Sequence, residues 1–197
     1  MSAPLVFDPP ARAELLRALA ALELAEATHR PLPMCQALLR VARCYRALGA
    51  LAPAEAALQQ ALRWAHAGAG SDLTVDVLCE SAETAAARAR HLAAPYGAAA
   101  LSDLADQPAS EESSAARRAA RERARDHAFE AAARAGAVSD PVWEVQVLLR
   151  ASEVLEQCGD HDDAEQLKLR AFGRCTGSLG PRADVARLPG TGRSADA

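Results

Sequence analysis

The chain has little of what several large protein classes need. Only 4% of its 197 residues are aromatic, and Lys168 is the single lysine among 22 basic residues. A phosphate-binding loop ending in Gly-Lys is therefore excluded, and the sequence holds no Gly-x-Ser-x-Gly turn of a serine hydrolase. Runs of β-branched and aromatic residues, which are typical of strands, are missing as well. These absences predict an all-α, non-catalytic protein without a cofactor.

Long hydrophobic runs and a strong excess of charge are also missing. No uncharged apolar stretch approaches the roughly 20 residues that span a bilayer. A net charge of −4 gives no general attraction to nucleic acid or to anionic membranes, so we expect neither as a partner. The five cysteines are an odd number without paired spacing, and the first residues lack the pattern of a signal peptide. Reduced thiols and a cytoplasmic location are the expectation.

What the chain does have is one pattern that occurs twice, 110 residues apart. In each copy a helix with apolar residues at i, i+3, i+4 and i+7 ends at a glycine, and a second helix rich in alanine follows. The first copy contains Leu38, Val41, Ala42, Tyr45, Leu48, Gly49, Ala54, Ala57, Ala61 and Leu62. The second contains Leu148, Ala151, Ser152, Leu155, Cys158, Gly159, Ala164, Leu167, Ala171 and Phe172. A shared offset over ten positions predicts a repeat architecture.

Capping residues, prolines and glycines divide the chain into about seven helices. We expect them over 9–28, 34–48, 53–67, 71–92, 110–136, 141–158 and 161–172. Pro31 and Pro33 are interpreted as separators between the first two helices. The breaker-rich stretch 95–114 is interpreted as an inserted loop, and the polar stretch 173–197 as a disordered tail. The folded domain is accordingly expected over 1–172.

The repeated residues resemble the tetratricopeptide repeat family, in its longer variety found in kinesin light chains. The resemblance is closest over 34–67, less complete over 142–172 and least complete over 72–136, where a third unit carries Val75, Leu78 and Ala82 on one helix and Ala124 and Ala128 on the next. It implies a right-handed stack of antiparallel helical hairpins, an α-solenoid. Stacked hairpins form an extended concave surface that binds other proteins. The implied function is that of an adaptor or scaffold, with a small secretion-type chaperone as the alternative.

The resemblance also implies which side of the first helix of each hairpin faces the concave groove. The predicted partner-binding residues on that side are Leu39, Arg43, Arg46, Asp76, Glu80, Glu83, Leu149, Glu153 and Glu156. Such a groove is basic at one end and acidic over the rest, so we expect a partner with a basic helical or extended segment. Reversing Glu80 and Glu153 to lysine is expected to abolish binding and to leave the fold intact. The oligomeric state does not follow from the sequence.

Two other clusters point to functions of a different class. A metal-dependent enzyme could use the cluster Cys158, Asp160, His161, Asp162 and Asp163, although a second ligand pair is missing and acids are favourable at a helix N-terminus in any case. An RNA binder could use the run Arg117, Arg118, Arg121, Arg123 and Arg125. Acidic residues interleave with these arginines, with Arg118–Glu122 and Glu130–Arg134 at i,i+4 spacing, and a solvated helix face is the favoured interpretation.

Overall fold

The structure is a computed structural model that describes residues 9–93, 111–137 and 140–176, and these residues form helices without any strand. The α-helices are α1 (Pro9–Thr28), α2 (Pro31–Ala47), α3 (Leu51–Trp64), α4 (Ser71–Ala93), α5 (Glu111–Ala135), α6 (Pro141–Cys158) and α7 (His161–Thr176). A π-helical turn, η1 (Ala65–Ala69), continues α3. The all-α prediction and the number of α-helices are therefore confirmed for the described part of the chain.

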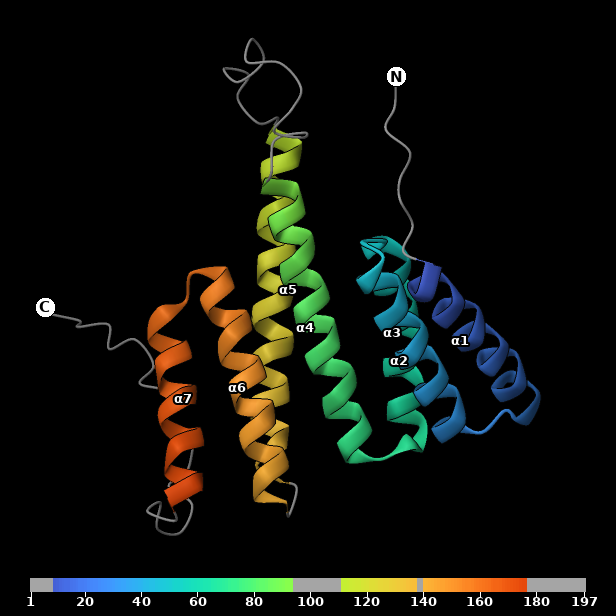
Figure 1. The fold of residues 1–197 in the computed structure, drawn as a ribbon. Coiled ribbons are helices and arrows are strands. Elements are labelled where there is room, and N and C mark those ends of the chain that lie inside the picture. The colour runs from blue at the N-terminus through green and yellow to red at the C-terminus, as the bar shows by residue number, and fades with distance from the viewer. Residues whose placement is uncertain (1–8, 94–110, 138–139, 177–197) are drawn as a thin grey trace, which may run out of the picture.

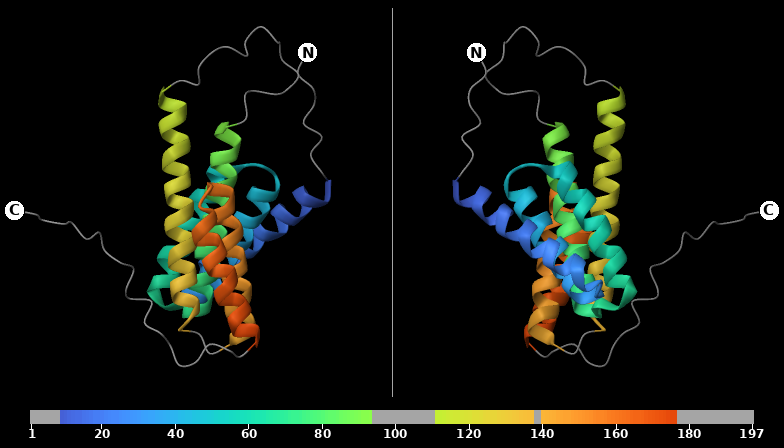
Figure 2. Two further views of the ribbon diagram at one scale, coloured as in Figure 1. Left: turned by 90° about the vertical axis from the view of Figure 1, so that its left-hand side faces the viewer. Right: turned by 90° about the vertical axis from the view of Figure 1, so that its right-hand side faces the viewer.

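Consecutive helices pack against each other along the whole row, from α1 at one end to α7 at the other (Figure 1). In addition, α4 contacts both α2 and α6, so these three helices lie side by side. The side views place α5 behind α4 relative to Figure 1, and both helices extend past their neighbours at one end (Figure 2). All buried residues of α5 are alanines, which let it approach α4 closely.

Several predicted boundaries differ from those in the structure. Helix α2 begins at Pro31 because a proline in the first turn needs no intrahelical N–H partner, so Pro31 and Pro33 start the helix and do not separate it. Helix α5 begins at Glu111, within one residue of the predicted helix start at 110, so only the end of the predicted 95–114 loop was placed too late, by four residues. Helix α7 continues to Thr176, beyond the predicted start of the tail at 173. Residues 94–110 and 177–197 lie outside the described part, and so do the predictions about them.

The two copies of the repeated pattern have the same local structure. Leu38 and Leu148 are both buried, and so are Ala54 and Ala164. The hairpin turns are also equivalent, since Gly49 and Gly159 both have a positive φ, +72° and +89°. The backbone N–H that follows each glycine bonds back to the helix, from Ala50 to Tyr45 O at 2.9 Å and from Asp160 to Leu155 O at 2.9 Å.

This equivalence gives a matched prediction for the two turns. Gly49→Ala and Gly159→Ala are each expected to lower the free energy of unfolding by about 1–2 kcal/mol, because a left-handed conformation is unfavourable for alanine. No atom within 4 Å obstructs an added Cβ at either glycine, so the cost comes from the backbone alone. Urea denaturation measures it. The asparagine variants are the controls, since asparagine tolerates the left-handed conformation. Alanine variants that are as stable as the wild type contradict the prediction.

Candidate protein-interaction surface

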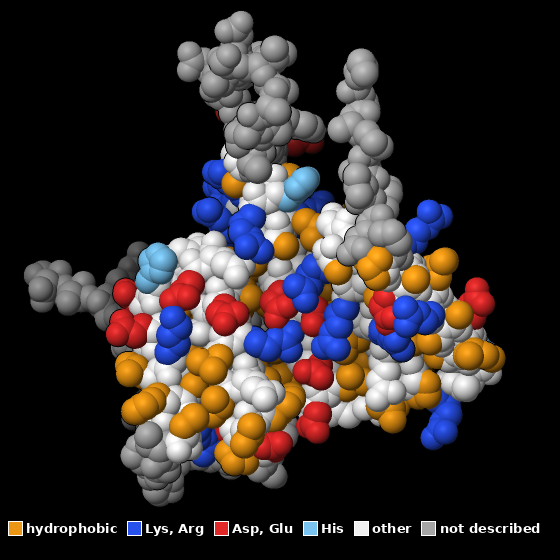
Figure 3. Space-filling view, in the orientation of Figure 1, with side chains coloured by type: hydrophobic (Ala, Val, Ile, Leu, Met, Phe, Trp, Pro, Cys, Tyr) orange, Lys and Arg blue, Asp and Glu red, His pale blue; other side chains and the backbone are white. Residues whose placement is uncertain are grey.

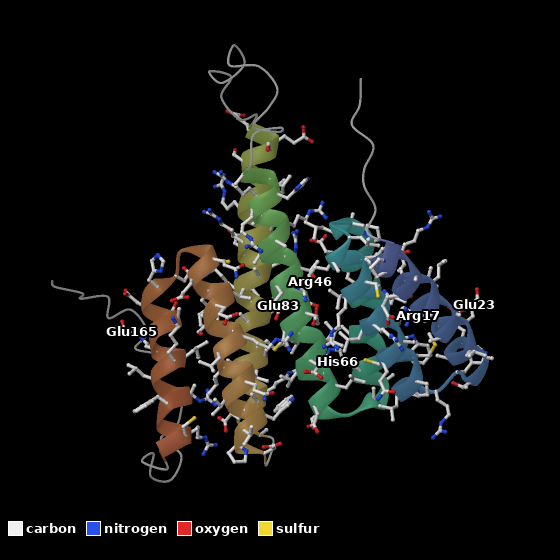
Figure 4. The ribbon with its side chains drawn as sticks, in the orientation of Figure 1. Arg17, Glu23, Arg46, His66, Glu83 and Glu165 are labelled. Carbon is white, nitrogen blue, oxygen red and sulfur yellow. The ribbon has the colours of Figure 1, made fainter. Side chains whose placement is uncertain are left out.

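Charged side chains from α2, α4 and α6 meet on the face of the molecule that Figure 3 shows, where they form a belt across its middle. This α2–α4–α6 face is defined by Arg43, Arg46, Asp76, Glu80, Glu83 and Arg150. The stick view shows Arg46 and Glu83 pointing toward each other from neighbouring helices (Figure 4). Five of these six residues were predicted from the sequence to share one surface.

Glu80 is the centre of the charge network on this face. Its side chain accepts hydrogen bonds from Arg43 Nε at 2.7 Å, Arg46 Nη2 at 2.8 Å and Arg150 Nη2 at 3.3 Å. Glu80 is only 4% exposed, so these bonds replace the water that the carboxylate loses on burial. Three helices are joined through one side chain. Glu80 therefore holds α2, α4 and α6 together, and it is not the exposed carboxylate that the sequence predicted.

The other two carboxylates of the network are paired as well. Glu83 Oε2 lies 2.9 Å from Arg46 Nη2, and Glu83 Oε1 lies 2.8 Å from Arg150 Nε. Asp76 Oδ1 lies 3.8 Å from Arg150 Nη1. Burial raises the pKa of Asp76, and the positive charges of Arg43 and Arg150 oppose this shift. Three arginines thus balance three carboxylates. This part of the surface is close to neutral, and the prediction that the groove is acidic beyond its basic end is wrong here because it left out Arg150.

The remaining predicted residues lie in different surroundings. Leu39 is 4% exposed and belongs to the hydrophobic core that α1, α2, α3 and η1 form together with Val77 of α4, so its place on the binding surface was wrongly predicted. Leu149 is 42% exposed, and Glu153 is exposed without an ion pair among the described residues. Glu156 pairs with Lys168 of α7 at an exposed position. The predicted residues that are exposed and lie outside the charge network are therefore all on α6.

Arg150 was missed because sequence patterns do not show which helices become neighbours. The repeat offset was the signal that could have found it, since Arg150 stands 110 residues after Arg40. Arg40 binds Glu14 on the preceding helix, α1, and Arg150 likewise reaches back from α6 to α4. In both repeated helices, the arginine at this position therefore binds a glutamate on a helix that comes earlier in the chain.

A second ionic cluster joins α6 to α7 and was also not predicted. Glu144 is 1% exposed and is bonded by Arg170 Nη2 at 2.9 Å and by Arg174 Nε at 2.8 Å. Helix α6 positions Glu144 in its first turn, where the Asp140 side chain caps the helix by accepting from the N–H groups of Val142 and Trp143. The cluster stabilises the last hairpin.

The buried thiols and the acids near Cys158 bear on the alternative of a metal-dependent enzyme. Burial raises the pKa of Cys35 to about 11 and that of Cys79 to about 12, so both thiols stay protonated at neutral pH. Asp160, from the cluster after Cys158, lies 2.9 Å from Arg125 Nε. No group of three or more His, Cys, Asp or Glu side chains within the described ranges is placed to hold a metal ion.

The arginine-rich helix α5 carries some of the pairing that its sequence predicted. Of the two predicted pairs, Glu130–Arg134 is formed, at 2.7 Å, and Arg125 makes a further ion pair that was not predicted, with Asp160 at the start of α7. No helix of the described part is long and apolar enough to cross a bilayer.

Comparison with models of protein families and with curated proteins finds no match for this chain.

Proposed function

We propose that the protein is a non-catalytic adaptor that binds a segment of another protein across its α2–α4–α6 face. In this proposal the chain is a cytoplasmic right-handed stack of helical hairpins of the tetratricopeptide type. The pairs α2–α3, α4–α5 and α6–α7 are its hairpins, and α1 covers one end. The equivalent glycine turns at Gly49 and Gly159, together with the contacts of α4 with both α2 and α6, support this interpretation.

The observation that carries the proposal is the charged network that crosses three helices on one face. Its ion pairs hold Arg43, Arg46 and Glu83 in fixed positions, and these side chains still keep part of their surface exposed. A partner therefore meets side chains that are already ordered, which lowers the entropic cost of binding. Beside the network, Leu149 and Glu153 on α6 add an apolar and an acidic contact, so a basic segment binds best at the α6 end.

The proposal is tested by affinity capture from the native cell with the full chain as bait. The variant Leu149→Asp with Glu153→Lys is expected to lose a protein that the wild type retains, because it removes the apolar contact and reverses the charge. Leu24→Asp with Glu23→Lys on the distant helix α1 is the matched control, since both residues are also exposed. Retention of the same proteins by wild type and both variants contradicts the proposed site.

A further inference from the structure

The two copies of the repeated pattern differ in whether a further helix packs beside them. The hairpin α2–α3 is followed by α4, which packs against both of its helices. The hairpin α6–α7 is the last one within the described residues, and no described helix occupies the corresponding place beside it. The two hairpins correspond at most positions of the repeated pattern, although the exposed Lys168 stands where the first hairpin has the buried Leu58. The first hairpin therefore indicates which side chains of the last one a further helix would cover.

Residues that α4 helps to cover on the first hairpin have exposed counterparts on the last. Leu39 lies on the side of α2 that faces α4, since Arg43 and Arg46 on the same side bind Glu80. Leu39 is 4% exposed, whereas its counterpart Leu149 is 42% exposed. Leu62 packs against core residues of α4, and its counterpart Phe172 is 68% exposed. Leu149, Glu153, Glu156 and Phe172 define the α6–α7 edge.

The charge of this edge is opposite to that of the first hairpin. Arg43 and Arg46 on α2 meet Glu80 and Glu83 on α4, whereas the counterparts of the two arginines on α6 are Glu153 and Glu156. Glu156 already pairs with Lys168 of α7, but both side chains of this pair are exposed and such surface pairs contribute little, so a basic side chain of a partner can compete for Glu156. A helix that lies against α6–α7 as α4 lies against α2–α3 is therefore complementary when it carries basic residues in place of Glu80 and Glu83. Opposite charges at such positions favour the matching partner, and like charges disfavour others.

We propose that the α6–α7 edge binds an amphipathic helix of a partner protein. The helix places apolar side chains on Leu149 and Phe172 and two basic side chains, three residues apart, against Glu153 and Glu156. This inference rests on the proposed adaptor function and specifies its partner. A second copy of the chain fits less well, because its α4 is acidic. Its exposed α1 carries Glu23, and Arg17 of α1 is already paired with Glu14 at 2.9 Å (Figure 4).

A peptide made from the chain's own α4 provides a probe. The fluorescently labelled peptide covers residues 71–93 and carries Glu80→Lys and Glu83→Lys, and the unmodified peptide is its control. The lysine peptide is expected to bind the full-length protein about tenfold more tightly than the control, a ratio that corresponds to about 1.4 kcal/mol. Fluorescence anisotropy measures both affinities, and binding of the lysine peptide is expected to weaken as salt rises.

Exchanging the charges on the protein makes the test specific. In the variant Glu153→Arg with Glu156→Arg, the unmodified peptide is expected to bind more tightly than the lysine peptide. Both positions are exposed, and the Glu156–Lys168 pair that the variant breaks lies on the surface, so the free energy of unfolding is expected to fall by no more than about 1 kcal/mol. Equal binding of the two peptides to the wild type overturns the proposal, and so does a preference that the exchange leaves unchanged.

Two further results also overturn the proposal. The first is failure of the lysine peptide to bind, which is the result expected when residues 177–197 of the chain itself cover the edge. The second is a dimer of the protein in sedimentation velocity that Leu149→Asp dissociates, which assigns the edge to a second copy. In either case the adaptor function is still judged by the capture experiment, so its failure and that of the helix proposal are distinguishable.

Discussion

Replacing Arg170 and Arg174 together by methionine is expected to lower the free energy of unfolding by about 3–5 kcal/mol, because the double variant leaves a buried carboxylate without its partners. Glu144 is 1% exposed and both arginines bind it within 2.9 Å. Desolvation of the unpaired charge is the cause of the loss. Urea denaturation of the variant and the wild type gives the difference directly.

The control for this prediction adds Glu144→Leu to the two methionines. The triple variant replaces the whole ionic cluster by apolar side chains of similar size, and such replacements are often neutral or stabilising. It is therefore expected to recover most of the loss. A double variant that loses less than about 1 kcal/mol shows that Glu144 is rehydrated at little cost and contradicts the structure at this position.

Glu80→Lys is expected to destabilise the protein by a similar amount, about 3–5 kcal/mol, because it places a fourth cation among three arginines at a buried position. This outcome differs from the expectation drawn from the sequence, in which Glu80 was a surface residue. Thermal unfolding followed by circular dichroism measures the effect as a fall in Tm.

Glu153→Lys is the matched control, since it reverses the same charge on the same face at an exposed position. Its stability is expected to stay within about 0.5 kcal/mol of the wild type. If Glu80→Lys and Glu153→Lys lower the free energy of unfolding equally, or if neither lowers it, the difference in burial between Glu80 and Glu153 is contradicted.

Much of the fold could be predicted because its signals are local. The Asp140-Pro141 start and the Gly159 end of α6 follow from capping and turn chemistry alone. The spacing of Leu148, Ala151 and Leu155 likewise shows which side of α6 is buried. These properties depend on a few neighbouring residues, so the helices and their buried sides follow from the sequence.

The site was harder to predict because its residues belong to different helices. Leu39 and Leu149 have the same sequence context, yet one is buried and the other exposed, since among the described helices only the first has a further helix beside its hairpin. Glu80 looks like a surface residue on a helical wheel, and its burial results from arginines that reach it from α2 and α6. Such features depend on how helices pack, which no local pattern contains.

The adaptor function is tested most directly by hydrogen–deuterium exchange of the full chain with and without the protein that it captures. We predict slower exchange in α2, α4 and α6, most of all in the peptides that contain Arg43, Glu83 and Leu149, because a bound segment restricts opening of these helices. Protection confined to α5, or exchange that the partner leaves unchanged along the whole chain, would contradict the account.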